Sequence, residues 1–184
     1  MGSAATSTKT DASNSRASDD LRAQLETLHP ASFGWALLCC DRNADRAADV
    51  LQTAYVRALS GAATYRGHSN VKTWFFGVIR MVALEARRTG RPMEVLEEKA
   101  IVPERFTPPN AVRTHERAEA QHLIDAMNEL PPRQREVLHL VFYEEMTLRE
   151  AAELLDIRFG SASTHYDRGK KSLLERLRMR GVTR

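Results

Sequence analysis

The side chains of this chain best suited to chemistry are polar and basic residues near its C-terminus. Between residues 158 and 184, eight lysines and arginines stand against only Asp167 and Glu175. Hydroxyl side chains can bind base edges or phosphates, whereas arginine and lysine more often bind phosphates. We therefore predict a DNA-binding surface made of six residues in this segment: Ser161, Ser163, Thr164, Asp167, Arg168 and Lys171. Asp167 could accept from a cytosine amino group or simply pair with Lys171 one helical turn later.

A second basic stretch lies in the first half of the chain. Residues 65–91 carry six basic side chains against Glu85 alone, and residues 93–129 carry eight acidic side chains against four basic ones. The net charge of +3 is too small to establish a polyanionic partner. Its distribution, however, predicts two nucleic-acid-facing surfaces separated by a segment that avoids phosphates.

The C-terminal basic segment needs helices to position it, and the sequence provides the signals for two. Thr147 and Glu150 form the pattern of a capping box at a helix start. A short turn over residues 156–160 follows, and we predict that Ser161 opens the final helix. The apolar or small residues of that helix recur on one face: Ala162, Tyr166, Gly169, Leu173 and Leu177. This pattern predicts a helix-turn-helix whose second helix enters the major groove, the alternative being a helical hairpin with a solvated basic face.

Two strongly patterned helices precede it in the first half of the chain. Apolar residues recur at helical spacing over residues 47–58 and again over residues 71–82. In the second helix the stripe consists of Val71, Trp74, Phe75, Val78, Ile79 and Val82. We expect Trp74 to pack in the core and Phe76 to lie on the opposite, exposed side.

The chain divides by composition into two domains. Residues 1–18 lack large apolar groups and are expected to form a disordered tail. Residues 93–113 are acidic and interrupted by prolines, which predicts a linker between helical domains at 19–92 and 114–184. Within the first domain, Asp19 or Asp20 could cap a helix that ends at His29 and Pro30. No strand-like alternation is present, so the predicted fold is all-α.

Several other functions are excluded or weak. The sequence has neither a membrane-spanning apolar run nor a secretory signal, and Cys39 and Cys40 are adjacent and cannot staple a fold, so we expect a cytoplasmic protein. No Walker loop, nucleophile elbow or dinucleotide motif occurs, and we expect neither an enzyme nor a cofactor. Glu119, His122 and His115 are too few to predict a metal site.

Three stretches, in chain order, resemble the extracytoplasmic-function (ECF) group of bacterial sigma factors, the two-domain members of the sigma-70 family. Residues 47–59 are similar to the polymerase-binding helix of that family, residues 65–88 to its −10 element segment and residues 130–177 to its −35 element domain. Each stretch alone is a weak match, but three in register identify the chain as resembling this family over most of residues 20–180.

The resemblance implies a role for each surface. The first helix would bind the β′ clamp helices of RNA polymerase through Asp49, Gln52, Thr53, Val56 and Arg57, although these residues could merely solvate a core helix. The loop and helix that follow would bind the −10 element through Arg66, His68, Asn70, Lys72, Thr73, Phe76, Arg80, Arg87 and Arg88. The C-terminal recognition helix, in which His165 joins the six residues above, would read the −35 element. Core polymerase (including its β flap), promoter DNA and an anti-sigma factor are the implied partners.

This sequence departs from the family pattern at two places. Ala48 and Ala54 stand where the family usually carries acidic residues, and Ser163 and His165 replace the usual lysine and arginine. The −35 sequence therefore cannot be predicted. A dimeric repressor using the same helix-turn-helix is the alternative from another class, but it leaves residues 47–88 without a role. A mimic that sequesters an anti-sigma factor would need a signalling domain for which the chain has no room.

Overall fold

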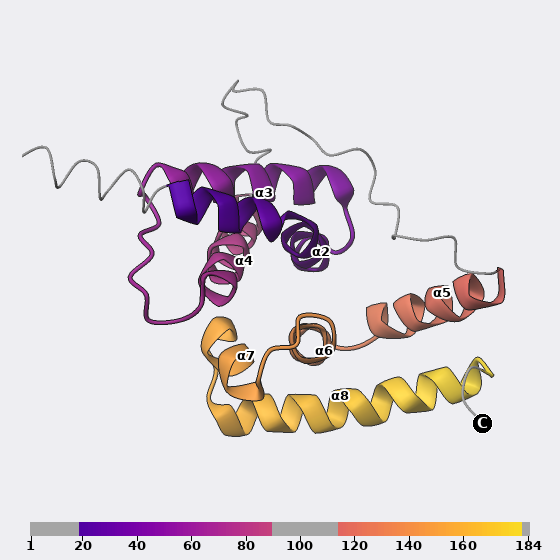
Figure 1. Cartoon of the computed structure of the whole chain (residues 1–184). Helices are drawn as coiled ribbons and strands as arrows, with labels where there is room; N and C mark the ends of the chain where they lie inside the picture. Colours follow the sequence, from indigo (N-terminus) through magenta and orange to yellow (C-terminus); the bar gives the residue numbers. More distant parts are fainter. Residues whose placement is uncertain (1–18, 90–113, 182–184) are drawn as a thin grey trace, which may run out of the picture. The chain divides into compact units, whose positions relative to one another are not determined.

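The computed structural model describes residues 19–89 and 114–181, with the side chains of the second range described from Gln121 onward. Within these ranges every regular element is a helix, which confirms the all-α prediction. The chain forms two compact units, Met1–Glu104 and Arg105–Arg184, and each is described by itself (Figure 1). The predicted tail, the predicted linker and the end of the chain from residue 182 lie outside the described residues. No described helix is long and apolar enough to cross a membrane.

In unit 1 a helix over residues 19–27 leads into α2 (His29–Cys39), α3 (Ala44–Leu59) and α4 (Val71–Thr89). Asp19 and Asp20 already lie inside the first helix, so neither caps it. The first helix stops before His29 and Pro30 as predicted, but both of these residues belong to α2, since proline is well accommodated in the first turn of the new helix. Asn43 and Asn70 accept backbone N–H bonds at the starts of α3 and α4, from Arg46 at 2.9 Å and Thr73 at 2.7 Å.

The core of unit 1 lies where α2, α3 and α4 meet pairwise. Its largest fully buried side chains include Trp35, Phe75, Phe76, Ile79, Val50 and Val82. Trp35 donates its indole N–H to the Phe76 carbonyl at 3.0 Å, and the two rings stack at a centroid distance of 5.8 Å. Burial of an indole requires such a partner for its N–H. This contact joins α2 to α4.

Unit 2 contains α5 (Thr114–Asn128), α6 (Pro132–Phe142), α7 (Leu148–Leu155) and α8 (Phe159–Met179). The long helix α8 packs against the other three, as its position along α5, α6 and α7 in Figure 1 illustrates. Met127, Leu130 and Leu138 form a core cluster, on which Leu123, Tyr166 and Leu173 pack. The connection after α7 turns at Asp156, whose φ of 53° is left-handed.

The structure tests two predictions about the helix-turn-helix. The capping box is confirmed: Thr147 Oγ1 accepts from the Glu150 N–H, and a Glu150 carboxylate oxygen accepts from the Thr147 N–H at 2.8 Å. The prediction that Ser161 opens the last helix was wrong, because α8 begins two residues earlier at Phe159, after Arg158 as its N-cap. The turn between α7 and α8 is therefore shorter than expected.

Gly169 sets how closely α6 and α8 approach. A Cβ built on Gly169 would lie 3.1 Å from Gln134 Cβ and 3.1 Å from Leu138 Cδ1. Gln134 Cβ is fixed by its own backbone, so rotating a side chain cannot relieve the contact. The small residue predicted for the inner face of α8 is therefore required by the packing of the two helices.

We expect Gly169→Ala to destabilise unit 2. Overpacking costs about 1–3 kcal/mol, which outweighs the gain of about 0.5–1 kcal/mol from replacing glycine within a helix. The matched control is Gly160→Ala in the same helix, where a Cβ would meet nothing within 4 Å and should be neutral or stabilising. Urea unfolding measures both variants. Equal stabilisation by the two substitutions would contradict this account of the α6–α8 contact.

Candidate nucleic-acid interface

The outward face of α8 carries most of the residues predicted to read DNA. Ser161, Thr164, Asp167, Arg168 and Lys171 are exposed, and Ser163 and His165 are partly exposed. On the inner face Ala162 and Gly169 are buried, so α8 has the two-sided character that the sequence predicted. Thr164 Oγ1 donates to the Gly160 carbonyl at 2.9 Å, which fixes its rotamer and leaves the hydroxyl oxygen as an acceptor.

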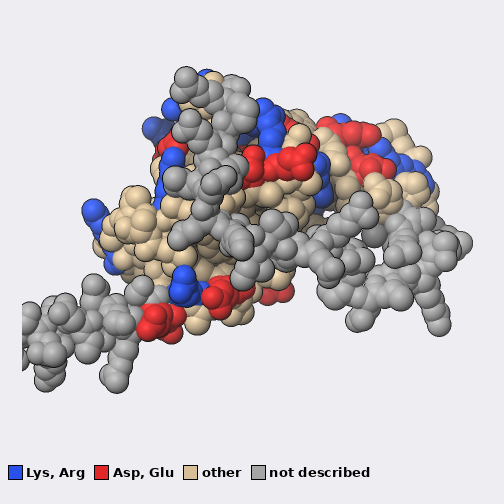
Figure 2. All heavy atoms as spheres, turned by 90° about the horizontal axis from the view of Figure 1, so that it is seen from above, with Lys and Arg blue, Asp and Glu red and all other residues tan. Residues whose placement is uncertain are grey.

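Not all of the basic residues of this segment belong to that face. Arg176 and Arg180 both form ion pairs with Glu129, which directly follows α5. These two cations therefore hold the C-terminal part of α8 against its own unit. On the face shown in Figure 2, positive and negative side chains are interspersed rather than gathered into one basic field. The small net charge of +3 indicates nucleic-acid binding less directly than the exposed face of α8 does.

In unit 1 the loop before α4 is held by its own hydrogen bonds. Tyr65 donates its hydroxyl to the Ser69 carbonyl at 2.7 Å, and Gly67 adopts a left-handed φ of 72°. Arg66, His68 and Asn70 are exposed. The Asn70 side-chain oxygen, predicted to contact the −10 element, accepts the Thr73 N–H and so also caps α4. The loop therefore presents Arg66 and His68 from a fixed backbone.

The sequence-based assignment of Thr73 and Phe76 to the exposed side of α4 was wrong. Phe76 is fully buried and Thr73 is 6% exposed. The reason is that α4 packs against α2 as well as α3, and Trp35 of α2 covers Phe76. The apolar face of α4 is therefore broader than a single stripe, and both side chains pack inside unit 1.

Trp74 was expected in the core and instead lies partly exposed at the edge of the packed face. Its ring contacts Tyr65 at a centroid distance of 5.2 Å and Phe75 at 6.2 Å. The other five residues of the predicted stripe are buried as expected. Trp74 and Tyr65 thus form an aromatic pair between the loop and the start of α4, and this pair was missed by periodicity alone.

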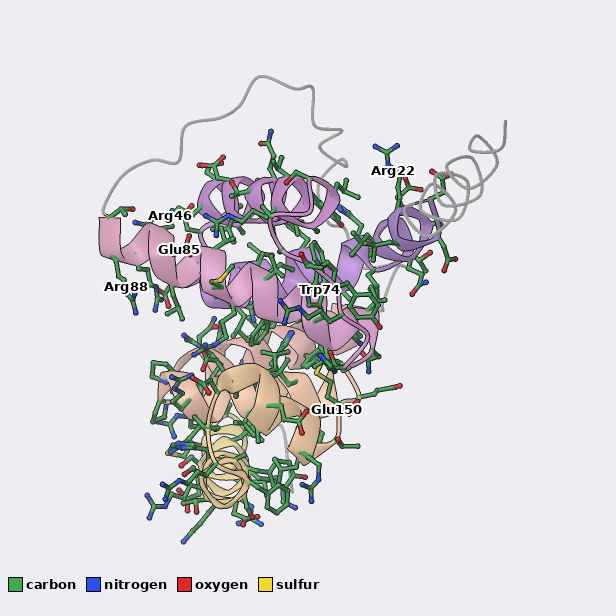
Figure 3. All side chains as sticks on the ribbon, turned by 90° about the vertical axis from the view of Figure 1, so that its left-hand side faces the viewer. Arg22, Arg46, Trp74, Glu85, Arg88 and Glu150 are labelled. Atoms are coloured by element: carbon green, nitrogen blue, oxygen red, sulfur yellow. The ribbon has the colours of Figure 1, made fainter. Side chains whose placement is uncertain are left out.

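The predicted cations of α4 differ in their surroundings. Lys72 lies over the Phe76 ring at 5.7 Å, so its stem covers apolar surface. Arg80 is partly exposed, and Arg87 is exposed and paired with Asp41 after α2. Arg88 is exposed at the far end of the helix from Trp74, as Figure 3 shows. Arg87 therefore has a structural partner in addition to any phosphate that it contacts.

The residues predicted to bind polymerase lie along α3. Val56 is 39% exposed, and Asp49, Gln52, Thr53 and Arg57 are partly exposed. Arg57 donates to Glu85 of α4 at 2.7 Å, which links α3 to α4. The five side chains therefore border the core of unit 1 and remain accessible at its surface.

Comparison with known proteins agrees with this geometry in both units. Residues 25–92 match the family model for Sigma-70 region 2, and residues 120–173 match that for Sigma-70, region 4. The chain is 31% identical to the ECF RNA polymerase sigma factor SigM of Bacillus subtilis (strain 168) over 66% of this chain and 73% of SigM. It is 26% identical to the RNA polymerase sigma factor SigV of the same organism over 71% of this chain and 75% of SigV. The chain belongs to the ECF group of RNA polymerase sigma factors.

A solved structure shows the same fold. The sigma factor RpoE of Bartonella quintana, determined in complex with the anti-sigma factor NepR, aligns with a TM-score of 0.63 at 22% identity. The alignment covers 86% of this chain and 97% of that chain. The ECF sigma factor family acts in transcription initiation, and the function predicted from the resemblance is confirmed at that level.

The described cysteines and histidines are the residues to compare with the pattern of a metal or redox site. Cys39 and Cys40 are buried and form no disulfide, and burial raises the pKa of the Cys40 thiol, so it stays protonated at neutral pH. Among the described residues no cluster of three metal-binding side chains occurs. The side chains of His115 and Glu119, which were considered as metal ligands with His122, lie outside the described residues.

The reversed positions of Trp74 and Phe76 give a direct test of the face assignment. We expect Phe76→Ala to lower the stability of unit 1 by about 3–5 kcal/mol, because it removes a fully buried ring. Trp74→Ala should cost less, about 1–3 kcal/mol, since its side chain is partly exposed. Thermal unfolding followed by circular dichroism compares the two. A Trp74→Ala variant as unstable as Phe76→Ala would show that Trp74 belongs to the core.

Proposed function

We propose that this ECF sigma factor uses three separate surfaces to bring RNA polymerase to promoters. The exposed side of α3, with Asp49, Gln52, Thr53, Val56 and Arg57, binds the β′ clamp helices. The loop at 65–70 and the exposed side of α4 bind the −10 element. The outward face of α8 reads the −35 element. The observation that carries this proposal is that one chain combines the exposed outward face of α8, which follows the capped helix α7, with the partly exposed Trp74 and the cations of α4.

The −10 surface extends along most of α4. Trp74 and Arg88 are 14 residues apart on this helix, or about 21 Å at 1.5 Å per residue. In duplex DNA that length corresponds to roughly six nucleotide steps at 3.4 Å each. Lys72, Arg80, Arg87 and Arg88 supply positive charge along it, and an unpaired base can stack on an aromatic ring. We assign that stacking role to Trp74, supported by Tyr65, in place of the buried Phe76.

In this proposal the protein is a binding subunit and not an enzyme. It acts in the bacterial cytoplasm, where core polymerase supplies the catalytic chemistry and the sigma factor supplies sequence selection. The region 4 unit also contacts the β flap, and an anti-sigma factor is a further partner. In support, RpoE of Bartonella quintana, which shares this fold, was solved with an anti-sigma factor bound.

Adding the protein to core RNA polymerase should give promoter-specific run-off transcripts from genomic DNA fragments of its own organism. Core polymerase alone is the background, and a second control is the protein carrying Trp74→Ala, which should bind polymerase but open promoters poorly. Transcription that remains at the core background across these fragments would overturn the proposed function.

Arg168→Ala should weaken −35-dependent recruitment without unfolding unit 2. Arg168 is exposed on the outward face of α8, and loss of one phosphate contact should reduce the slope of log affinity against log salt by about 0.9. Holoenzyme binding to a promoter fragment at several salt concentrations measures this slope. A large fall in melting temperature would instead place Arg168 in a structural role.

A further inference from the structure

The two helices of the helix-turn-helix are joined at their starts by a cation–π contact. The Arg149 guanidinium carbon lies 5.5 Å from the centroid of the Phe159 ring. Arg149 is the second residue of α7, and Phe159 is the first residue of α8. The distance is within the range of about 6 Å over which a cation is attracted to an aromatic face.

Phe159 contributes little to the core of unit 2. Its side chain is 51% exposed, and the core cluster of Met127, Leu130 and Leu138 forms without it. An exposed phenylalanine alone needs no explanation. Here, however, the exposed ring lies against Arg149. Among the described residues, Arg149 is the only charged residue in the first turn of α7 that has neither a carboxylate nor a capping partner.

Arg149 itself is exposed, and within the described ranges no ion pair engages it. The adjacent carboxylate, Glu150, is occupied by the backbone N–H and hydroxyl of Thr147, both at 2.8 Å. The capping box therefore fixes the backbone of this turn while leaving the Arg149 guanidinium available. Its position is set by Phe159 rather than by a counter-charge.

The position of the Arg149–Phe159 pair in the helix-turn-helix determines which part of the DNA it can contact. In a helix-turn-helix the first helix crosses the DNA backbone, and the N-terminal residues of the second helix approach base edges. A cation at the start of the first helix that rests on the start of the second lies at the edge of the groove, where phosphates are found. We propose that Arg149 binds a backbone phosphate beside the base pairs read by α8, and that Phe159 is the positioning residue for its guanidinium. This inference rests on the proposed reading of DNA by α8.

The chemistry of the pair fits that role. Stacking uses the flat face of the guanidinium and leaves its N–H edge free to donate two parallel bonds to phosphate oxygens. An arginine held on a ring also loses less side-chain freedom when it binds. A lysine at position 149 would keep the charge but not the planar stack or the paired donors.

The test measures binding of the full-length holoenzyme to a promoter fragment that supports run-off transcription, over a series of salt concentrations. Arg149→Ala should weaken binding and lower the salt slope by about 0.9, the value for one phosphate. Phe159→Leu should weaken binding by roughly two- to fivefold, the effect of losing an exposed cation–π contact. Phe159→Tyr, which keeps the aromatic face, should bind as the original protein does.

A double variant separates positioning from a structural role. If Phe159 acts through Arg149, Phe159→Leu should cause no further loss in the Arg149→Ala background. Arg22→Ala, which removes an exposed arginine from unit 1, is the charge-matched control and should leave the slope unchanged. Melting temperatures should match in all of these variants.

The contrary outcomes are distinct. An Arg149→Ala slope equal to that of the original protein overturns the phosphate contact. Additive losses in the double variant, or failure of Phe159→Tyr to retain binding, overturn the positioning role. Absence of promoter binding by the original holoenzyme would overturn the proposed function itself, and with it this inference.

Discussion

The contact between Trp35 and Phe76 is the interaction on which unit 1 depends. A buried indole N–H must be paired, and here its acceptor is a carbonyl of α4 at 3.0 Å. That bond, together with the stacked rings, fixes the rotation of α4 about its axis relative to α2. With this rotation, Trp74 lies partly exposed at the edge of the packed face, and Arg87 and Arg88 are exposed. The surface assigned to the −10 element is therefore a consequence of how the core is packed.

Unit 2 is governed by a steric constraint of a different kind. At Gly169 the backbone of α8 comes so close to α6 that a Cβ would lie only 3.1 Å from Gln134 and Leu138, and this closeness sets the distance between the two helices. The capping box at Thr147 fixes the start of α7 independently. The close contact at Gly169 and the cap at Thr147 hold α7 and α8 in fixed positions within unit 2. Precise base contacts require side chains on such rigid elements. Binding specificity can then vary through exposed residues without altering the packing.

Helical periodicity predicted most of this fold, and its failures have one physical cause. Successive residues of a helix are about 100° apart, so Trp74 and Phe76 flank Phe75 symmetrically. The apolar stripe of α4 cannot distinguish them. Trp35, which is about 40 residues away in the sequence, determines which of the two is buried, because it covers Phe76 and not Trp74. The same limit applies to Thr73, whose burial follows from a neighbour and not from its own type.

Predictions that rest on residues close together in the sequence were more accurate than those that rest on helical periodicity. The capping box needs only Thr147 and Glu150, and the close approach at Gly169 was visible as a small residue in an inner face. The start of α8 was misplaced because Phe159, a large apolar residue at the first helical position, carries no capping signal of its own. The ion pairs of Arg57, Arg87 and Arg176 could not be predicted, since each partner comes from another element.

The adjacent thiols of Cys39 and Cys40 allow local opening of unit 1 to be measured by thiol labelling. Both are buried at the end of α2, and the raised pKa of Cys40 keeps its reactive anion scarce. A thiol reagent can therefore modify them only in the fraction of molecules in which this end of the helix has opened. The rate of labelling then measures the free energy of that local opening, in the manner of amide hydrogen exchange. Because α2 carries Trp35, the same rate also follows how firmly α4 is held in place.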